Sequence, residues 1–358
     1  MLKILKSIFL FFSPYVNFSE RKADKFFTNI KSTDLIGDIR ENLLKLMQEN
    51  MISLNLWMEK KFKGYKYLTK GTRRKMYANT EKIKQKFEEF CRTSGITVDV
   101  VKKMLDRAEI SYPNGSDEQI VHIANIMGFL APERYYHYIK TSSFGKLLND
   151  PDKNKLEGDC NQIVTLYIYL FSLKFPANEL QIKLLKEHVC LHFREMDIEA
   201  TNGQFAKYRE FEHILPVTEI ISTNLLDIED FREDVSYISP RVILKSAQLA
   251  FSISSLRTLV EKNLKVAYRN MAISSMGSQD FYAADFFASK SGDIDLINAV
   301  RKNQMVHEYN KLAHQVAGVR TVADAKNHKS DYQKMLSLAQ KMGDSEMEKN
   351  LRDTLNKI

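Results

Sequence analysis

Cysteine, tryptophan and proline are scarce in this sequence, and it has no glycine-rich phosphate loop. The 358 residues include three cysteines, one tryptophan, seven prolines and 13 glycines. Three cysteines without a Cys-x-x-Cys pair are too few for the disulfide framework of a small secreted domain, so we expect a reducing compartment such as the cytoplasm. The sequence also has no dinucleotide-binding fingerprint, and we expect no cofactor.

The apolar run at the start of the chain is too short to cross a bilayer, which needs about 20 residues. In MLKILKSIFLFFSPYVN, Lys3 and Lys6 precede the run from Ile8 to Phe12. This arrangement imitates the start of a signal peptide, but no small-x-small cleavage site follows it. We favour a helix docked on the body of the protein. A membrane-surface anchor and a secretion signal remain open.

Acidic residues are under-represented in the first quarter of the chain. Residues 1–90 contain 19 Lys and Arg against 10 Asp and Glu, while the whole chain has a net charge of +8. The patch from Lys60 to Lys86 predicts an anionic partner, either nucleic acid or a membrane surface, with Phe62, Tyr65 and Tyr67 interleaved among the cations. The alternative is a solvated helical face whose aromatic side chains point into the core. We favour this alternative because no nucleic-acid-binding signature accompanies the charge.

The apolar content of 44% and charged content of 27% are typical of a globular chain, long enough for two or three domains. Helical periodicity dominates both ends of the sequence, and only the middle contains the alternation that is typical of strands. We therefore predict a predominantly helical α+β protein. Its expected parts are a helical region at 1–140, a core at 141–222 and a helical region at 223–358.

The segment 156–203 contains the candidate chemistry. Asp159, with Gln162 three positions later, has the form of a capping box, which makes Cys160 the first residue of a helix. The following IVTLYIYLFSL is apolar on nearly every face, so we expect this helix to be buried. A cysteine at the positive end of a helix macrodipole favours thiolate over thiol.

Residues 187–193 alternate between two kinds of side chain. His188, Cys190 and His192 fall on one side and apolar residues on the other, which predicts a half-buried strand. Residues 197–201 can form an antiparallel return strand that ends at an Asn-Gly turn. A carboxylate on the return strand can then lie opposite a histidine on the outgoing strand.

Three short motifs in this order resemble those of the transglutaminase-like cysteine peptidase family. They are Gly-Asp-Cys at Cys160, His-Val at His188 and Ile-Glu-Ala-Thr at Glu199, where the family usually has Asp. The resemblance covers only the core of the chain. It implies a small papain/transglutaminase-like core in which a Cys-bearing helix packs against a short antiparallel sheet. It also implies cysteine-dependent acyl transfer or hydrolysis on amide bonds of a protein or peptide substrate, as a peptidase, deamidase or transglutaminase-type enzyme. In such a triad Cys160 is the nucleophile, His188 the base and Glu199 the acid.

Other interpretations of the same residues remain open. His192 is an alternative base, and Asp197 shares a strand face with Glu199. His188, Cys190 and His192 could instead ligate a metal with Cys160 or Glu199, although we expect no metal. Asn154 and Asn161 lie near Cys160 in sequence, but neither is a convincing second oxyanion donor. The rival hypothesis is a catalytically inactive scaffold or adaptor that binds a protein or anionic partner through its helical regions.

The sequence pattern of the C-terminal third is similar to that of tetratricopeptide-type helical hairpins. An aromatic-rich helical stretch ends at Gly292-Asp293, and a second, degenerate copy ends at Gly343-Asp344. The SirB1-like members of the transglutaminase-like family, which this chain resembles, carry similar tetratricopeptide-like helices after the core. A single hairpin cannot bury its own apolar face, so we expect these helices to pack on the core or on a protein partner.

Overall fold

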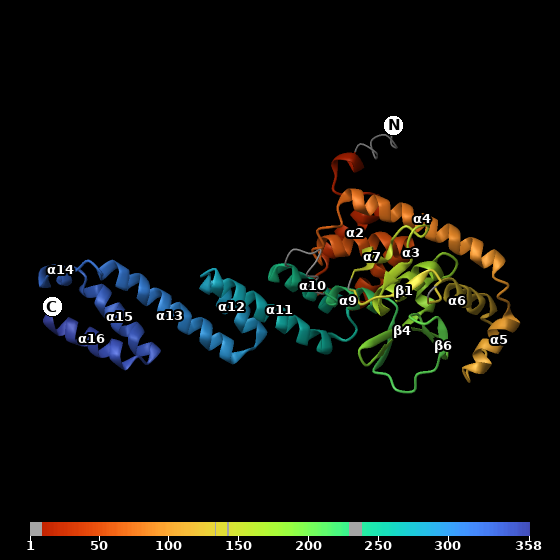
Figure 1. Ribbon diagram of the computed structural model, residues 1–358. Helices are drawn as coiled ribbons and strands as arrows, with labels where there is room; N and C mark the ends of the chain where they lie inside the picture. The colour runs from red at the N-terminus through yellow and green to blue at the C-terminus, as the bar shows by residue number, and fades with distance from the viewer. Residues whose placement is uncertain (1–8, 133, 142, 229–237) are drawn as a thin grey trace. The chain divides into compact units, whose positions relative to one another are not determined.

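The computed structural model describes residues 9–132, 134–141, 143–228 and 238–358. The protein is α+β and mostly helical, at 65%, with a five-stranded antiparallel sheet in the middle (Figure 1). The chain divides into two compact units, Met1–Asn263 and Leu264–Ile358. The boundaries expected near residues 140 and 222 fall inside the first unit, where one apolar core takes side chains from Ala23 to Val260.

The sequence places helices on both sides of a short stretch of strands. The helices of the first unit are α2 (Phe18–Asn29), α3 (Ile36–Lys61), α4 (Lys70–Thr93), α5 (Val98–Arg107), α6 (Asp117–Phe129), α7 (Phe144–Leu147), α8 (Cys160–Ser172), α9 (Glu219–Leu226) and α10 (Pro240–Ile253). The strands are β1 (Tyr136–Tyr138), β2 (Leu156–Gly158), β3 (Gln181–Leu185), β4 (His188–Phe193), β5 (Met196–Glu199), β6 (Gln204–Ala206) and β7 (His213–Pro216).

The central sheet has the strand order β6-β5-β4-β3-β7, with every neighbouring pair antiparallel. Tight turns join β3 to β4 and β4 to β5, and each contains a non-glycine residue with positive φ, Glu187 and Arg194. The register pairs Lys183 with Cys190 and His192 with Asp197. The polar residues at alternate positions of β3, β4 and β5 therefore share one face of the sheet.

The β4 strand is more buried than the alternation predicts. The apolar side packs in the core, as expected, but Cys190 and His192 on the other side are buried as well. The prediction of a half-buried strand is therefore wrong. Asp197 of the neighbouring strand β5 supplies the hydrogen bond that the buried His192 requires, and Tyr208, after β6, bonds to Glu199 on the same side of the sheet.

Helix α8 is buried on nearly all sides, as its sequence predicts. It contacts α3, α6 and α9 as well as strand β4, and Phe171 lies beside Phe193 with ring centroids 6.3 Å apart. Its one buried threonine, Thr165, accepts a hydrogen bond from the amide of Asn224 on α9 (3.0 Å). Each fully buried large apolar side chain contributes roughly 1.5–3 kcal/mol. This packing fixes the helix that presents Cys160.

The basic residues between Lys60 and Lys86 form more ion pairs, and their aromatic neighbours are more buried, than the sequence alone suggests. Phe62 and Tyr65 are buried, so their rings belong to the core and are not free to stack on a ligand. Buried Arg73 pairs with Glu20 at 2.7 Å. The helical stretch breaks around Gly64, between the end of α3 and the start of α4.

The second unit continues the chain with helix hairpins. Gly292 and Gly343 both end a helix in the left-handed conformation, with φ of 72°. In each case the next residue, Asp293 or Asp344, caps the following helix through its side chain. The two predicted hairpin turns are therefore confirmed. The helices concerned are α11 (Arg257–Gly277), α12 (Phe281–Ser291), α13 (Ile294–Val316), α14 (Val322–Asn327), α15 (Lys329–Met342) and α16 (Ser345–Lys357).

In the part of the chain that the structure describes, no helix combines the length and apolarity needed to span a bilayer. The first eight residues of the N-terminal apolar segment lie outside the described residues. From Phe9 onward the segment forms a short helical turn, and Phe9 stacks on Phe18 of α2.

Candidate active site

Cys160 is the first residue of α8, as the capping box predicts. The carboxylate of Asp159 accepts the backbone N–H of Asn161 at 3.0 Å, and the side chain of Gln162 accepts the N–H of Asp159 at 3.1 Å. These bonds fix the first turn of the helix. The thiol is partly exposed, whereas the rest of the helix is buried. The fold therefore presents a free cysteine at the positive end of a rigid helix.

His188 and Glu199 come together across the sheet. Oε2 of Glu199 lies 2.8 Å from Nε2 of His188. The side chain of His188 is 27% exposed, but that of Glu199 is only 3% exposed. Because an ionised carboxylate can only accept hydrogen bonds, Nε2 carries the ring proton. The other ring nitrogen, Nδ1, is then the one available to serve Cys160.

Three protein groups hold the carboxylate of Glu199 in addition to His188. The hydroxyl of Tyr208 donates to Oε2 at 2.8 Å. The hydroxyl of Thr201 donates to Oε1 at 2.5 Å, and its backbone N–H donates to the same oxygen at 3.2 Å. Burial opposes ionisation of Glu199, but the bonds from His188, Thr201 and Tyr208 outweigh it and lower the pKa of this carboxyl. A buried acid with this many donors is fixed in orientation.

The imidazole of His188 is held from both sides. The pKa of His188 is raised to about 10. Hydrogen bonding to Cys160 is the largest cause, and hydrogen bonding to Glu199 is the second. Burial acts in the opposite direction and is outweighed. Cys160 therefore lies close enough to His188 to favour its protonated ring, and Glu199 holds the same ring at 2.8 Å. This arrangement can stabilise an imidazolium beside the sulfur and move a proton between them.

The alternative base lies in a different cluster. Nδ1 of His192 is 2.7 Å from Asp197, whose other oxygen accepts from Lys183 at 2.7 Å. The backbone N–H of Tyr208 completes the set at 2.7 Å. Asp197 is thus committed to His192 and Lys183, and Glu199 is the acid that serves His188.

The metal alternative is not supported by the geometry. Across the described ranges, no three His, Cys, Asp or Glu side chains are grouped so that they could hold a metal ion. Cys190 lies between the two histidines on β4, but burial is the main cause that raises the pKa of its thiol. A protonated, buried thiol is a poor metal ligand and a poor nucleophile.

A second carboxylate lies near the start of α8. Asp227, just after α9, accepts the side-chain amides of Asn161 at 3.1 Å and Gln162 at 3.2 Å. Burial, followed by the charge of Asp227, raises the pKa of Asp159 to about 7. The amide of Asn161 is therefore occupied, which argues against it as an oxyanion donor. Asn154 is exposed in the turn before β2.

Sequence reasoning missed Tyr208, Asp227 and Tyr167. Tyr208 follows β6, and only the folding of the strands brings its hydroxyl to Glu199. Tyr167 lies on α8, buried, with a hydroxyl that has no hydrogen-bond partner in the described structure. Burial and the nearby charge of Glu199 raise its pKa. No local pattern in the sequence marks any of these positions.

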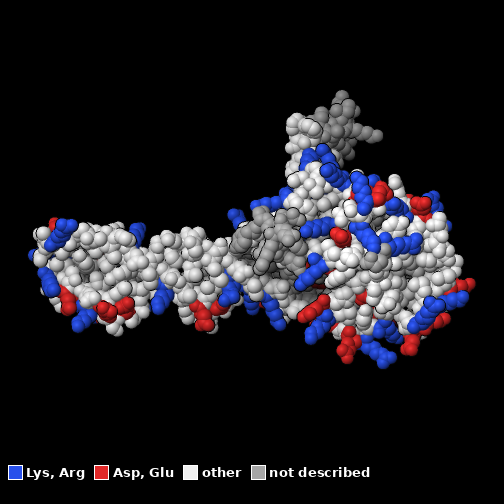
Figure 2. All heavy atoms as spheres, viewed as in Figure 1, with Lys and Arg blue, Asp and Glu red and all other residues white. Residues whose placement is uncertain are grey.

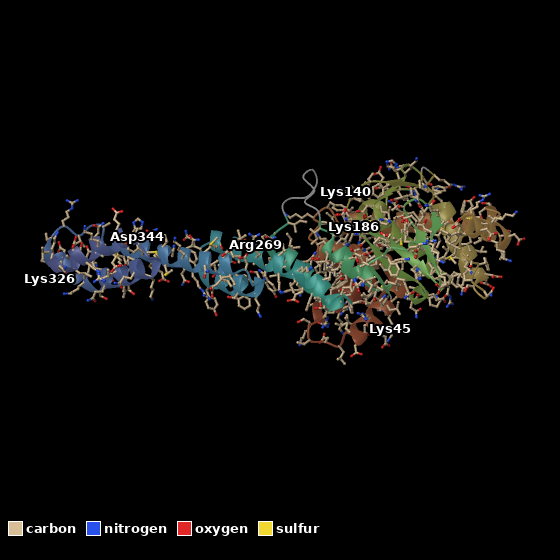
Figure 3. The ribbon with its side chains drawn as sticks, turned by 90° about the horizontal axis from the view of Figure 1, so that it is seen from below. Lys45, Lys140, Lys186, Arg269, Lys326 and Asp344 are labelled. Atoms are coloured by element: carbon tan, nitrogen blue, oxygen red, sulfur yellow. The ribbon has the colours of Figure 1, made fainter. Side chains whose placement is uncertain are left out.

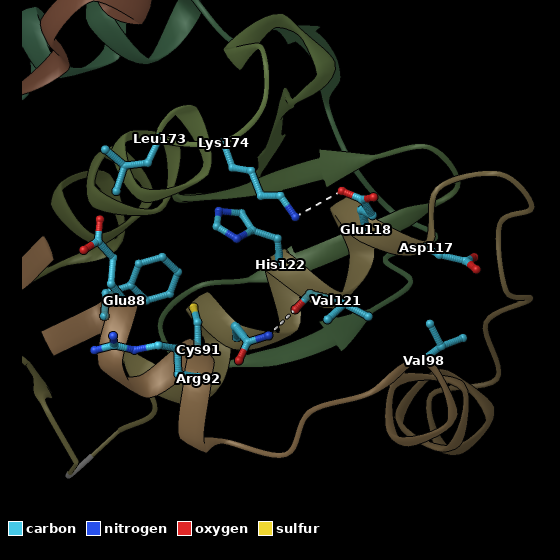
Figure 4. Close-up of a pocket in the computed structure, with 12 residues that line it drawn as sticks. Glu88, Cys91, Arg92, Val98, Asp117, Glu118, Val121, His122, Leu173 and Lys174 are labelled. Atoms are coloured by element: carbon cyan, nitrogen blue, oxygen red, sulfur yellow. Dashed lines mark hydrogen bonds and ion pairs between the residues drawn. The ribbon is translucent and has the colours of Figure 1, made fainter. Parts of the chain in front are cut away.

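Two other features lie outside the triad. Figure 3 shows Lys186 in the β3–β4 turn, two residues before His188, where its side chain is exposed. Figure 4 shows a separate cavity of about 650 Å³ lined by Cys91 and His122. There Nε2 of His122 is bonded to the carbonyl of Leu170 at 3.1 Å, and burial raises the pKa of the Cys91 thiol. Cys91 therefore serves as an internal reference for an unactivated cysteine.

Comparison with known proteins adds nothing to this geometry. No protein-family model, no curated protein and no solved structure matches the chain.

Proposed function

We propose that the protein is a cysteine-dependent enzyme of the transglutaminase-like kind, which transfers or hydrolyses the acyl group of an amide. The observation that carries the proposal is the placement of Cys160 beside His188, whose ring Glu199 holds at 2.8 Å. Triads are recognised by geometry and roles, and here each residue has a neighbour suited to its role. We assign Cys160 as nucleophile, His188 as base and Glu199 as the group that fixes the ring.

In the proposed reaction the proton of the Cys160 thiol already resides on Nδ1 of His188, because the raised pKa of this ring favours the imidazolium. The sulfur then attacks an amide carbonyl, and a thioester forms as the C–N bond breaks. The imidazolium of His188 returns its proton to the departing amine. Because the capping box uses the N–H of Asn161, we propose the backbone N–H of Cys160 as a donor to the oxyanion. Water or a second amine then resolves the thioester.

The test is the rate of iodoacetamide labelling at each cysteine, followed by mass spectrometry between pH 5 and 9. We expect Cys160 to react at least tenfold faster than Cys91 below the usual thiol pKa of about 8.5. Replacement His188→Ala should slow Cys160 at least tenfold and leave Cys91 unchanged. The matched control is His213→Ala, an exposed histidine of the same sheet. Equal rates at Cys160 and Cys91 in the wild type would contradict the proposal.

If Cys160 is activated, a peptide amide substrate distinguishes the two outcomes of the thioester. Hydrolysis alone produces a carboxylate, and a mass increase of one unit identifies a deamidated glutamine. Incorporation of an added primary amine identifies acyl transfer. Either product must disappear in Cys160→Ala.

A second candidate function is an adaptor without catalysis. The observation that favours it is a pair of exposed aromatic side chains on α12, Tyr282 (90% exposed) and Phe286, one helical turn apart. Two such rings on one helix face are suited to a protein partner. This candidate predicts that Cys160→Ala leaves function intact, whereas Tyr282→Ser with Phe286→Ser abolishes partner binding.

All three cysteines are free thiols, which fits a reducing compartment such as the cytoplasm.

A further inference from the structure

The N-terminal segment ends in an exposed pair of phenylalanine rings. Phe11 is 72% exposed and Phe12 is 82% exposed, and their rings meet edge to face with centroids 5.1 Å apart. Single exposed apolar residues are common on protein surfaces. Two adjacent, almost fully exposed phenylalanines at the tip of a short helical turn are less common and mark a binding surface.

The base of this segment is anchored to the first unit. The ammonium of Lys70, the first residue of α4, donates to the backbone carbonyls of Phe11 at 3.1 Å and Ser13 at 2.6 Å. Further along, the hydroxyl of Tyr15 donates to Asp24 at 2.7 Å, and its ring packs on Trp57 with centroids 4.8 Å apart. The fold therefore holds the two rings in the open and does not bury them.

Positive charge gathers at the start of α4, where Lys70 bonds to the N-terminal segment. Arg74 and Lys75 lie exposed on the first turns of α4, and neither has an ion pair with any residue the structure describes. Burial, followed by the charges of Arg74 and Arg73, lowers the pKa of Lys70. Figure 2 shows Lys and Arg side chains gathered at the foot of the N-terminal segment.

We propose that this end of the molecule binds the surface of an anionic lipid bilayer. Phe11 and Phe12 insert at the boundary between headgroups and acyl chains, and Arg74 and Lys75 lie against lipid phosphates. Aromatic rings beside cations are the combination that interfacial anchors use. The sequence before Phe9 adds Lys3, Lys6 and further apolar residues of the same character. The proposal does not depend on the chemistry of Cys160.

Nucleic acid is the competing anionic partner, and the observations favour lipid. The aromatic residues inside the basic stretch, Phe62 and Tyr65, are buried and cannot stack on bases. The exposed rings lie at the N-terminal segment and outside the basic stretch, and they meet edge to face. Insertion into a bilayer requires only that the rings leave water together.

The test is flotation of the full-length chain with vesicles of phosphatidylcholine alone, or with about 30% phosphatidylserine. We expect binding to the anionic vesicles only, weakened at least tenfold by Phe11→Ser with Phe12→Ser. The matched control is Phe286→Ser, an exposed phenylalanine on α12. Replacement of Arg74 and Lys75 by Gln should reduce both the binding and its dependence on salt, since fewer cations face the lipid.

Three results would overturn the proposal. They are absence of binding to anionic vesicles at low salt, equal binding of the double phenylalanine variant and the wild type, and binding of a single-stranded oligonucleotide that depends on Phe11 and Phe12 in place of lipid. Circular dichroism checks that each variant is folded. The labelling rate of Cys160 should be the same in all variants, so failure of lipid binding is distinguishable from failure of the catalytic proposal.

Discussion

Glu199 holds the imidazole of His188 from a buried position, with its Oε2 2.8 Å from Nε2 of the ring. The acid is shielded from solvent, while the histidine is partly exposed. A hydrogen bond between an ionised, buried acceptor and an N–H is stronger than one at the surface. The ring is therefore fixed in tautomer and orientation at the end away from the nucleophile.

Replacement Glu199→Gln should lower the pKa of His188 from about 10 by at least one unit, because a neutral amide no longer favours the imidazolium. The measurement is an NMR titration of the His188 ring. Labelling of Cys160 by iodoacetamide should slow in parallel at pH 6–7. The control is Glu195→Gln, an exposed carboxyl in the β4–β5 turn. An unchanged His188 titration in Glu199→Gln would show that the two side chains are uncoupled in solution.

Tyr208→Phe removes one donor to Glu199 and leaves the ring in place. A partly buried hydrogen bond to a carboxylate contributes about 1–2 kcal/mol, and the loss should appear as a lower urea midpoint. The pKa of Glu199 should rise, because one bond that favours its ionised form is gone. We expect Cys160 labelling to slow less than in Glu199→Gln, since His188 keeps its own bond to the acid. Tyr282→Phe, on the exposed face of α12, should change neither quantity.

The parts of the site that the sequence predicted are local. The capping box spans four residues, and the strand that carries His188 is marked by alternation, so both follow from short-range rules. The pairing of His188 with Glu199 follows from a hairpin with a two-residue turn. In both the capping box and the His188–Glu199 pair, the relative position of the two side chains is determined by the few residues between them in the sequence.

The parts that the sequence did not predict depend on topology. Tyr208 reaches Glu199 only because β6 returns beside β5 and the chain then crosses the polar face of the sheet. Arg73 and Glu20 are 53 residues apart, so a basic stretch in the sequence becomes, in part, a buried ion pair. Burial on both faces of β4 likewise requires a cover that no local pattern reveals.

The two histidines of β4 should differ in their effects. His192→Gln removes a buried partner of Asp197 and should lower the unfolding free energy by about 1–3 kcal/mol. It should leave the labelling of Cys160 in the folded protein unchanged within twofold. Lys183→Met should be more damaging, about 3–5 kcal/mol, because Asp197 then keeps a buried charge without its cation. If His192→Gln slows Cys160 as much as His188→Ala does, the assignment of the base is wrong.

Asp159 and His188 predict a characteristic loss of stability as pH rises. Each has a folded-state pKa above its unfolded value, so the folded state binds more protons and the free energy of unfolding falls with pH. For Asp159 the fall lies between about 4 and about 7, and for His188 between about 6.5 and about 10. Each should contribute about 1–2 kcal/mol after allowance for solvent screening.

Asp159→Asn should remove the decrease in the free energy of unfolding between about pH 4 and about pH 7, while the amide keeps an oxygen for the helix cap. This variant should therefore be more stable than the wild type at pH 7 and above. His188→Gln should flatten only the upper window. The measurement is urea unfolding from pH 4 to 10 at constant salt, with Asp280→Asn, the exposed cap of α12, as the control. The difference from the wild type should grow with pH within the stated window and then level off. A difference that is constant over the whole range would mean that the Asp159 carboxyl titrates alike in the folded and unfolded chains, and that burial beside Asp227 does not affect it.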